Sequence, residues 1–158
     1  MSRLFQSLRE EKGYAASAFS SVNTPRFTGF WRARATVRSD ASADALAIML
    51  GHLKRLCDEP VSAADLDEAK RAVSGQFALG LEQPGTVLTL SYLRYRYGFS
   101  TDYWERYPAR LNAVTPAEVQ AVAQKYLHPD RAHVVAVGDG SRIRAALGKL
   151  GAVEGAVA

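Results

Sequence analysis

Hydrophobic and polar positions alternate cleanly in one part of the chain. From Gly29 to Arg38 one side of an extended segment collects Trp31, Ala33, Ala35 and Val37, and the other collects Arg32, Arg34, Thr36 and Arg38. A period of two predicts a strand with one buried face. Residues 14–22 predict a second strand, and Asn23-Thr24-Pro25-Arg26 supplies turn residues between them. The two strands are therefore expected to pair as a hairpin.

The pattern changes to a helical period after Ser42. One stripe holds Leu46, Met49, Leu50, Leu53, Leu56 and Cys57, which predicts a core-facing helix that ends at Asp58-Glu59-Pro60. Further helices are predicted over 3–12, 62–81, 87–97, 102–111, 115–127 and 141–147. Ser62 and Thr115 stand where helix-capping residues are expected, and Gly13 stands where a helix ends. Residues 133–137 predict a short buried strand.

These elements define an α+β fold, with about six helices packed on a small, mostly antiparallel sheet. Residues 1–150 are expected to form a single domain, followed by a flexible tail over 151–158. Three strands leave two unpaired edges, which proteins usually complete or cover. The sheet edge therefore predicts self-association.

Composition narrows the class of protein without fixing it. The 158 residues are 47% hydrophobic and 23% charged, the mix of a globular domain. The net charge of +4 comes from 20 basic and 16 acidic residues spread along the chain, so a nucleic-acid partner is not favoured. The run 92–97 alternates aromatics and arginines, as in a stacking surface for single strands. Its helical spacing favours instead a buried Tyr92, Tyr95 and Phe99 with solvated arginines.

The first residues show neither a signal-peptide pattern nor a membrane-spanning run. The compartment is therefore left open between a bacterial-type cytoplasm and periplasm. Cys57 is the single cysteine, which excludes an internal disulfide.

Several ordered segments resemble the C-terminal homology domain of insulinase/pitrilysin-type zinc peptidases, the group that includes mitochondrial-processing-peptidase-like proteins. Residues 2–17 are similar to the family pattern SRLFxxLREExGxxYS. Similar segments follow in family order at 53–85, LKRLCDEPVSAADLDEAKRAVSGQFALGLEQPG, and at 107–139, YPARLNAVTPAEVQAVAQKYLHPDRAHVVAVGD. In that family such a domain opens with further strands and a helix. The resemblance thus implies a truncated insulinase-type homology domain.

The family binds zinc through an H-x-x-E-H motif that this sequence does not contain. Its histidines are His52, His128 and His133, and Arg55 stands where a motif beginning at His52 would need Glu. No metal ligand, catalytic residue or cofactor is therefore expected in this chain. The resemblance places the zinc in a partner domain or subunit.

The resemblance assigns substrate binding to Arg9 and Tyr14. In complete relatives an Arg and a Tyr of this domain hold the substrate backbone and help to stabilise the oxyanion, a role that suits guanidinium and phenol donors. Many relatives carry the Tyr three residues after the glycine, where this chain has Ala16. The alternatives are a solvated helix arginine and an aromatic on a half-buried strand. The row of Arg32, Arg34 and Arg38 is either a solvated face or a surface for acidic or extended peptides.

The predicted function is the substrate-binding, non-zinc-bearing part of an insulinase-type metallopeptidase, inactive alone. It would support peptide hydrolysis by a zinc-motif-bearing peptidase domain or partner subunit, with a peptide substrate as the second partner. The alternative is a catalytically inactive structural or assembly subunit of the same fold.

Overall fold

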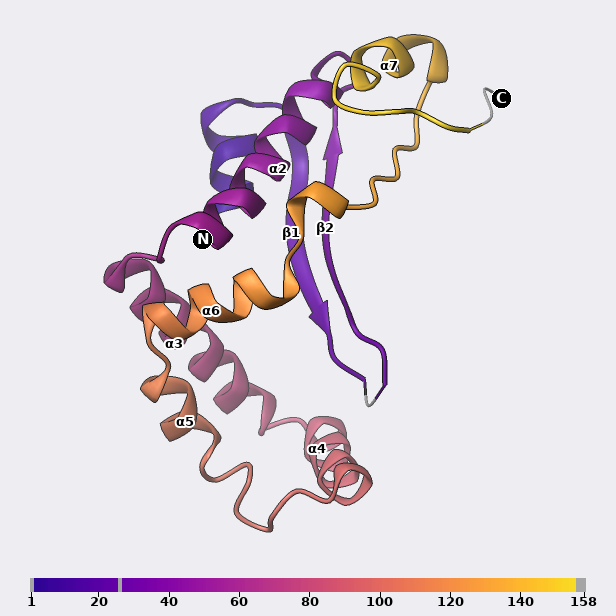
Figure 1. Ribbon diagram of the computed structural model, residues 1–158. Helices are drawn as coiled ribbons and strands as arrows, with labels where there is room; N and C mark the ends of the chain where they lie inside the picture. The colour runs from indigo at the N-terminus through magenta and orange to yellow at the C-terminus, as the bar shows by residue number, and fades with distance from the viewer. Residues whose placement is uncertain (1, 26, 156–158) are drawn as a thin grey trace. The chain divides into compact units, whose positions relative to one another are not determined.

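A computed structural model describes residues 2–25 and 27–155 of the chain (Figure 1). The chain divides into two compact units, residues 1–58 with 126–158 and residues 59–125. The described residues form seven α-helices and one two-stranded antiparallel sheet. This confirms the predicted α+β class, with helices packed on a small sheet.

The hairpin of the first unit consists of β1 (Ala15–Asn23) and β2 (Phe30–Val37). Its register places Ala18 opposite Ala35 and Phe19 opposite Arg34. Exposure alternates along β2 as predicted, so the arginines lie on the open face. The loop brings the backbone close to itself: a Cβ on Gly29 would lie 2.5 Å from the Asn23 carbonyl oxygen. Only glycine fits there.

One face of the hairpin is covered by α1 (Arg3–Phe5), the π-helix η1 (Gln6–Glu11) and α2 (Ser42–Asp58). Figure 1 shows α2 running along the hairpin. The core between these elements contains Leu4, Leu8, Ala15, Ala18 and Ala45, with Leu8 fully buried. The alanines let helix and sheet approach closely, and the leucines supply most of the apolar area.

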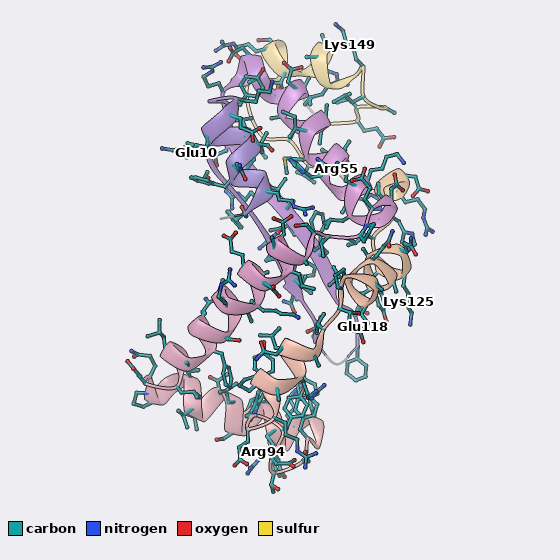
Figure 2. The ribbon with its side chains drawn as sticks, turned by 90° about the vertical axis from the view of Figure 1, so that its left-hand side faces the viewer. Glu10, Arg55, Arg94, Glu118, Lys125 and Lys149 are labelled. Atoms are coloured by element: carbon teal, nitrogen blue, oxygen red, sulfur yellow. The ribbon has the colours of Figure 1, made fainter. Side chains whose placement is uncertain are left out.

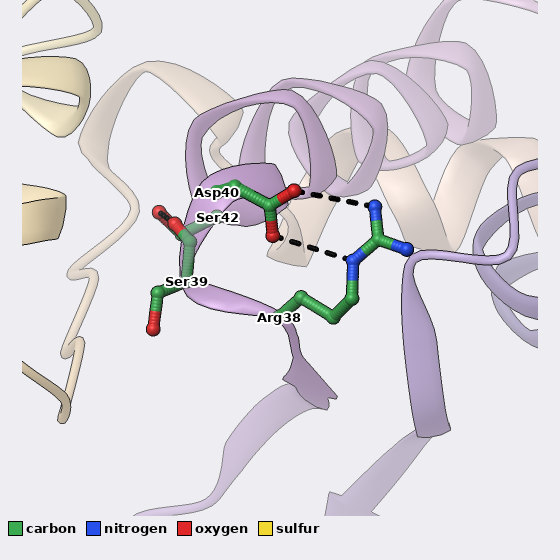
Figure 3. A network of polar contacts seen from close by, with 4 residues as sticks. All are labelled: Arg38, Ser39, Asp40 and Ser42. Carbon is green, nitrogen blue, oxygen red and sulfur yellow. Dashed lines mark hydrogen bonds and ion pairs between the residues drawn. The ribbon is translucent and has the colours of Figure 1, made fainter.

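A short polar turn connects β2 to α2. Arg38 faces Asp40, and the Ser42 hydroxyl donates to the Ser39 carbonyl at 2.9 Å (Figure 3). The turn contains the 3₁₀ helix η2 (Ser39–Ala41). Its Ala41 is 3% exposed, so the turn is anchored in the core.

The end of the first unit contains the 3₁₀ helix η3 (Pro129–Arg131) and α7 (Gly140–Leu147). Asp139 caps α7 by accepting the Ser141 N–H at 3.0 Å. Arg144 on α7 donates to the carbonyls of Val153 and Gly155. These bonds hold the following residues against the helix as far as Gly155. The predicted flexibility of residues 151–158 and the domain extent 1–150 remain predictions.

The second unit contains α3 (Ala63–Gly80), α4 (Pro84–Tyr97), α5 (Tyr107–Ala113) and most of α6 (Pro116–Tyr126). The capping signals are confirmed: Ser62 accepts the Asp65 N–H, and Thr115 and Glu118 cap each other reciprocally. The unit is held by neighbouring aromatic rings from α3, α5 and the segment between α4 and α5: Phe77, Phe99, Tyr103, Trp104 and Tyr107. Across the described residues, no helix combines the length and apolarity needed to cross a membrane.

Several sequence expectations are wrong. Residues 133–137 form no strand, and Val135 and Val137 are 89% and 96% exposed. A strand needs a hydrogen-bonding neighbour, and within the described chain β1 and β2 pair only with each other. The helix expected over 102–111 begins at Tyr107, after a turn in which Ser100 donates to Asp102. Tyr92 and Tyr95 are 53% and 90% exposed rather than buried, and Tyr97 provides the ring that stacks on Phe99.

Candidate substrate-binding site

Arg9 lies on a π-wound turn. The sequence predicted one continuous helix over 3–12, but after a single α-turn the chain widens into η1. π-turns are rare and occur often at functional sites, because the extra residue changes where the following side chains point. The turn ends at Gly13, whose φ of +62° is the left-handed conformation expected at a helix end. The Tyr14 N–H then donates to the Leu8 carbonyl at 2.8 Å, which fixes the start of the strand.

The Arg9 side chain is exposed but held in place. Its Nη1 donates to the Ala16 carbonyl at 2.6 Å, and its Cζ lies 5.7 Å from the centroid of the Phe5 ring. A guanidinium has five N–H donors. Within the described residues only the Ala16 carbonyl is recorded as an acceptor for them, and the side chain is exposed. The neighbours of Arg9 therefore fix the position of its side chain and leave hydrogen-bond donors available for a ligand.

The partner of Arg9 is a bulged residue. The hairpin register steps from Ala15 opposite Val37 to Ser17 opposite Thr36, which leaves Ala16 without a cross-strand partner. A bulge removes its residue from the ladder and redirects its backbone groups. Here the redirected carbonyl accepts the Arg9 bond. The sequence Ala15-Ala16-Ser17 contains no glycine or proline that signals this bulge, so sequence reasoning missed it.

Tyr14 is half-buried between the π-turn and the strand. Its backbone is tied on both sides, because its N–H binds the Leu8 carbonyl and its carbonyl accepts the Arg38 N–H at 3.2 Å. Its hydroxyl binds no group among the described residues. The structure thus brings Arg9 to Ala16, where many relatives have Tyr, and shows no hydrogen bond between Arg9 and Tyr14. The role of Tyr14 stays a prediction.

The three arginines of the predicted basic row differ in their surroundings. Arg38 is paired with Asp40, with Nε–Oδ1 and Nη2–Oδ2 distances of 3.3 Å (Figure 3). Arg32 and Arg34 are exposed and have no carboxylate partner in the described part of the chain. Arg32 instead lies with its Cζ 5.7 Å from the Phe30 ring centroid. Of the three arginines in the predicted basic row, only Arg32 and Arg34 therefore keep a positive charge without a neighbouring carboxylate in the described part of the chain.

A hydrogen bond ties the π-turn to α2, the helix that carries Arg55 in Figure 2. His52 Nε2 and Ser7 Oγ are 2.9 Å apart in a partly buried position. Burial lowers the pKa of His52, the positive charges of Arg55 and Arg3 lower it further, and Glu11 partly opposes them. The neutral imidazole is therefore favoured.

The described residues do not fit a zinc ion. No three His, Cys, Asp or Glu side chains gather in the described ranges 2–25 and 27–155. His52 lies 2.9 Å from the Ser7 hydroxyl, through its Nε2.

Comparison with known proteins shows which protein family and which solved structures this chain is similar to. Residues 1–73 match the family model described as "Peptidase M16 inactive domain". A solved structure titled as the peptidase M16 inactive domain from Pseudomonas fluorescens shares the fold, with a TM-score of 0.74 over 82% of this chain and 31% of that chain, at 19% identity. A conserved protein from Enterococcus faecalis V583 gives a TM-score of 0.69 over 78% of this chain and 29% of that one, at 27% identity.

The sequence relatives point the same way. An uncharacterised zinc protease of Streptomyces coelicolor is 30% identical over 132 residues, which cover 80% of this chain and 28% of the relative. Residues 1–73 are similar to the M16 inactive (C-terminal) domain, and the recognition of an insulinase/pitrilysin-type C-terminal homology domain without a zinc motif is confirmed. It spans less than a third of the length of the Streptomyces relative.

Proposed function

We propose that this chain is the substrate-binding, non-zinc-bearing part of an insulinase-type metallopeptidase. It supports peptide hydrolysis by a zinc-bearing domain or partner subunit, and has no activity alone. The observation that carries this proposal is the exposed Arg9 guanidinium, which is held by Ala16 and Phe5 through one hydrogen bond and one ring contact.

Arg9 would bind the substrate through its unoccupied N–H groups. A peptide carbonyl, or the oxyanion that forms from it, accepts such bonds, and the positive charge stabilises developing negative charge. Because the 2.6 Å bond to Ala16 already orders the side chain, binding costs little further rotamer entropy. Tyr14 would add a phenol donor from the start of the strand.

The relatives support this role. The Streptomyces relative is named a zinc protease, and residues 1–73, which match the M16 inactive-domain model, include both Arg9 and Tyr14. No group of three His, Cys, Asp or Glu side chains gathers among the described residues, and the proposal therefore assigns the metal to another domain or subunit. The chain's own contribution is then to bind and orient the peptide.

The test is peptide hydrolysis by the chain alone and mixed with an H-x-x-E-H-bearing protein encoded by the same genome. Activity should appear only in the mixture. Replacing one oxyanion donor typically costs about 10²–10³ in kcat, so Arg9→Ala should lower the mixture's kcat by that order. Arg38→Ala is the matched control, since the Arg38 charge is already paired with Asp40. Equal activity of wild type and Arg9→Ala would refute the role of Arg9.

The second candidate is a structural or assembly subunit of the same fold, and the open backbone of the hairpin favours it. In the described chain each strand has one neighbour, so both outer edges offer unpaired N–H and C=O groups. Such edges support self-association or pairing with another chain. Light scattering of the purified chain tests this: a monomer at all concentrations contradicts self-association. A partner complex whose hydrolysis is indifferent to Arg9→Ala favours the assembly role.

A further inference from the structure

The open face of the hairpin is the strongest unassigned surface of the described chain. The face toward the core is occupied by Ala18, Ala35 and Val37. Because side chains alternate along a strand, Arg32 and Arg34 point to the opposite side, and both are exposed. Their cross-strand partners are Ser21 and Phe19.

This face of the hairpin carries positive charge and has no acidic side chains. The cross-strand register gives it the residues Ser17, Phe19, Ser21, Arg32, Arg34 and Thr36, none of them acidic. Arg38, at the end of β2, is already neutralised by Asp40. Two arginines with no carboxylate partner in the described residues complement a ligand that brings its own carboxylates.

The geometry selects an extended ligand. Arg32 and Arg34 are two residues apart on one strand, so their attachment points repeat at roughly 6.6 Å. Alternate side chains of an extended peptide repeat at the same distance, so carboxylates two residues apart can meet both guanidinium groups. Phe19 and Phe30, 45% and 51% exposed, lie beside the arginines and supply apolar surface for the aliphatic parts of glutamate side chains.

We propose that Arg32 and Arg34 form a subsite for an extended peptide that carries two carboxylates two residues apart. The inference rests on the proposed function, because it names the substrate class of the same peptide-binding chain. It assigns specificity to Arg32 and Arg34, and general backbone binding to Arg9.

The test is an NMR titration of the ¹⁵N-labelled full chain at low ionic strength. The probes are a short peptide with two glutamates two residues apart and its twin with glutamines. The glutamate peptide should bind more tightly and shift amides of β1 and β2. Exposed ion pairs contribute about 0.2–1 kcal/mol each, so the double variant Arg32→Gln/Arg34→Gln should lower its affinity by roughly two- to thirtyfold. The preference should shrink at high salt.

Two controls separate the subsite from the proposed function. Arg38→Gln should leave the preference for glutamate intact, while Arg9→Gln should weaken both peptides equally. Equal affinity for the two peptides overturns the subsite, and leaves the proposed function standing if Arg9→Gln still weakens both. Failure of both peptides to bind overturns the proposed function and the subsite with it. Tighter binding of a single-stranded oligonucleotide through the same two arginines also overturns the peptide subsite.

Discussion

Replacing Gly13 measures the energetic cost of the left-handed backbone conformation that joins the π-turn to β1. Gly13 has a φ of +62°, and a Cβ placed on it meets no atom within 4 Å. Alanine therefore creates no clash with the surrounding structure, and its cost is local. A left-handed conformation costs an L-residue roughly 1–2 kcal/mol. The reduced freedom of the unfolded chain offsets about 0.4–1 kcal/mol of this. Gly13→Ala should lower the free energy of unfolding by about 1 kcal/mol.

Gly51 provides a matched comparison with the opposite sign. It lies inside α2, and its added Cβ also meets nothing within 4 Å. Alanine is better than glycine in a helix interior by roughly 0.5–1 kcal/mol, so Gly51→Ala should stabilise the protein. Gly13→Asn should cost less than Gly13→Ala, because asparagine tolerates the left-handed region.

Urea unfolding followed by far-UV circular dichroism measures all three variants. Hydrogen exchange of the β1 and β2 amides reports separately on the first unit, which contains both glycines. Gly13→Ala unfolding at the same or higher urea concentration than wild type would refute the argument. So would equal losses for Gly13→Ala and Gly51→Ala, since that would mean the added methyl group itself destabilises the fold.

Three further changes test the packing, the histidine bond and the expectation that this chain binds no metal. Leu8→Ala removes the fully buried leucine and should cost about 2–5 kcal/mol of unfolding free energy, measured in urea; a loss below 1 kcal/mol would contradict the core described above. Burial lowers the pKa of His52 in the fold, so the unfolded chain binds the proton first and stability should fall as pH drops below about 6.5. His52→Gln should flatten this part of the pH profile of Tm, and an unchanged profile would exclude His52 as its source. A chelator should leave the Tm of the isolated chain unchanged; a clear drop would reveal a bound metal.

Sequence patterns predicted the elements that depend on local chemistry. The alternation around Ala33 and Ala35 predicted the strand and its buried face, and the capping signals at Ser62 and Thr115 placed two helix starts. Failures occurred where structure depends on a distant partner. Residues 133–137 have the composition of a strand, but a strand forms only where another strand pairs with it. Tyr95 has helical core spacing, yet the folding of the 100–107 segment decides which aromatics pack.

For the candidate site, the sequence by itself determined which residues are present: Arg9, Gly13 four positions later, and no H-x-x-E-H motif. These are matters of residue identity and spacing. Tertiary structure decided that the turn is π-wound, that Ala16 is bulged and that its carbonyl holds Arg9. It also decided that Arg38 is neutralised while Arg32 and Arg34 are not. The reason is physical: the bulge arises from how two strands pair, and the bond to Ala16 from how the π-turn meets β1. The Arg38–Asp40 pair depends on the folded turn between β2 and α2, which brings the two side chains together.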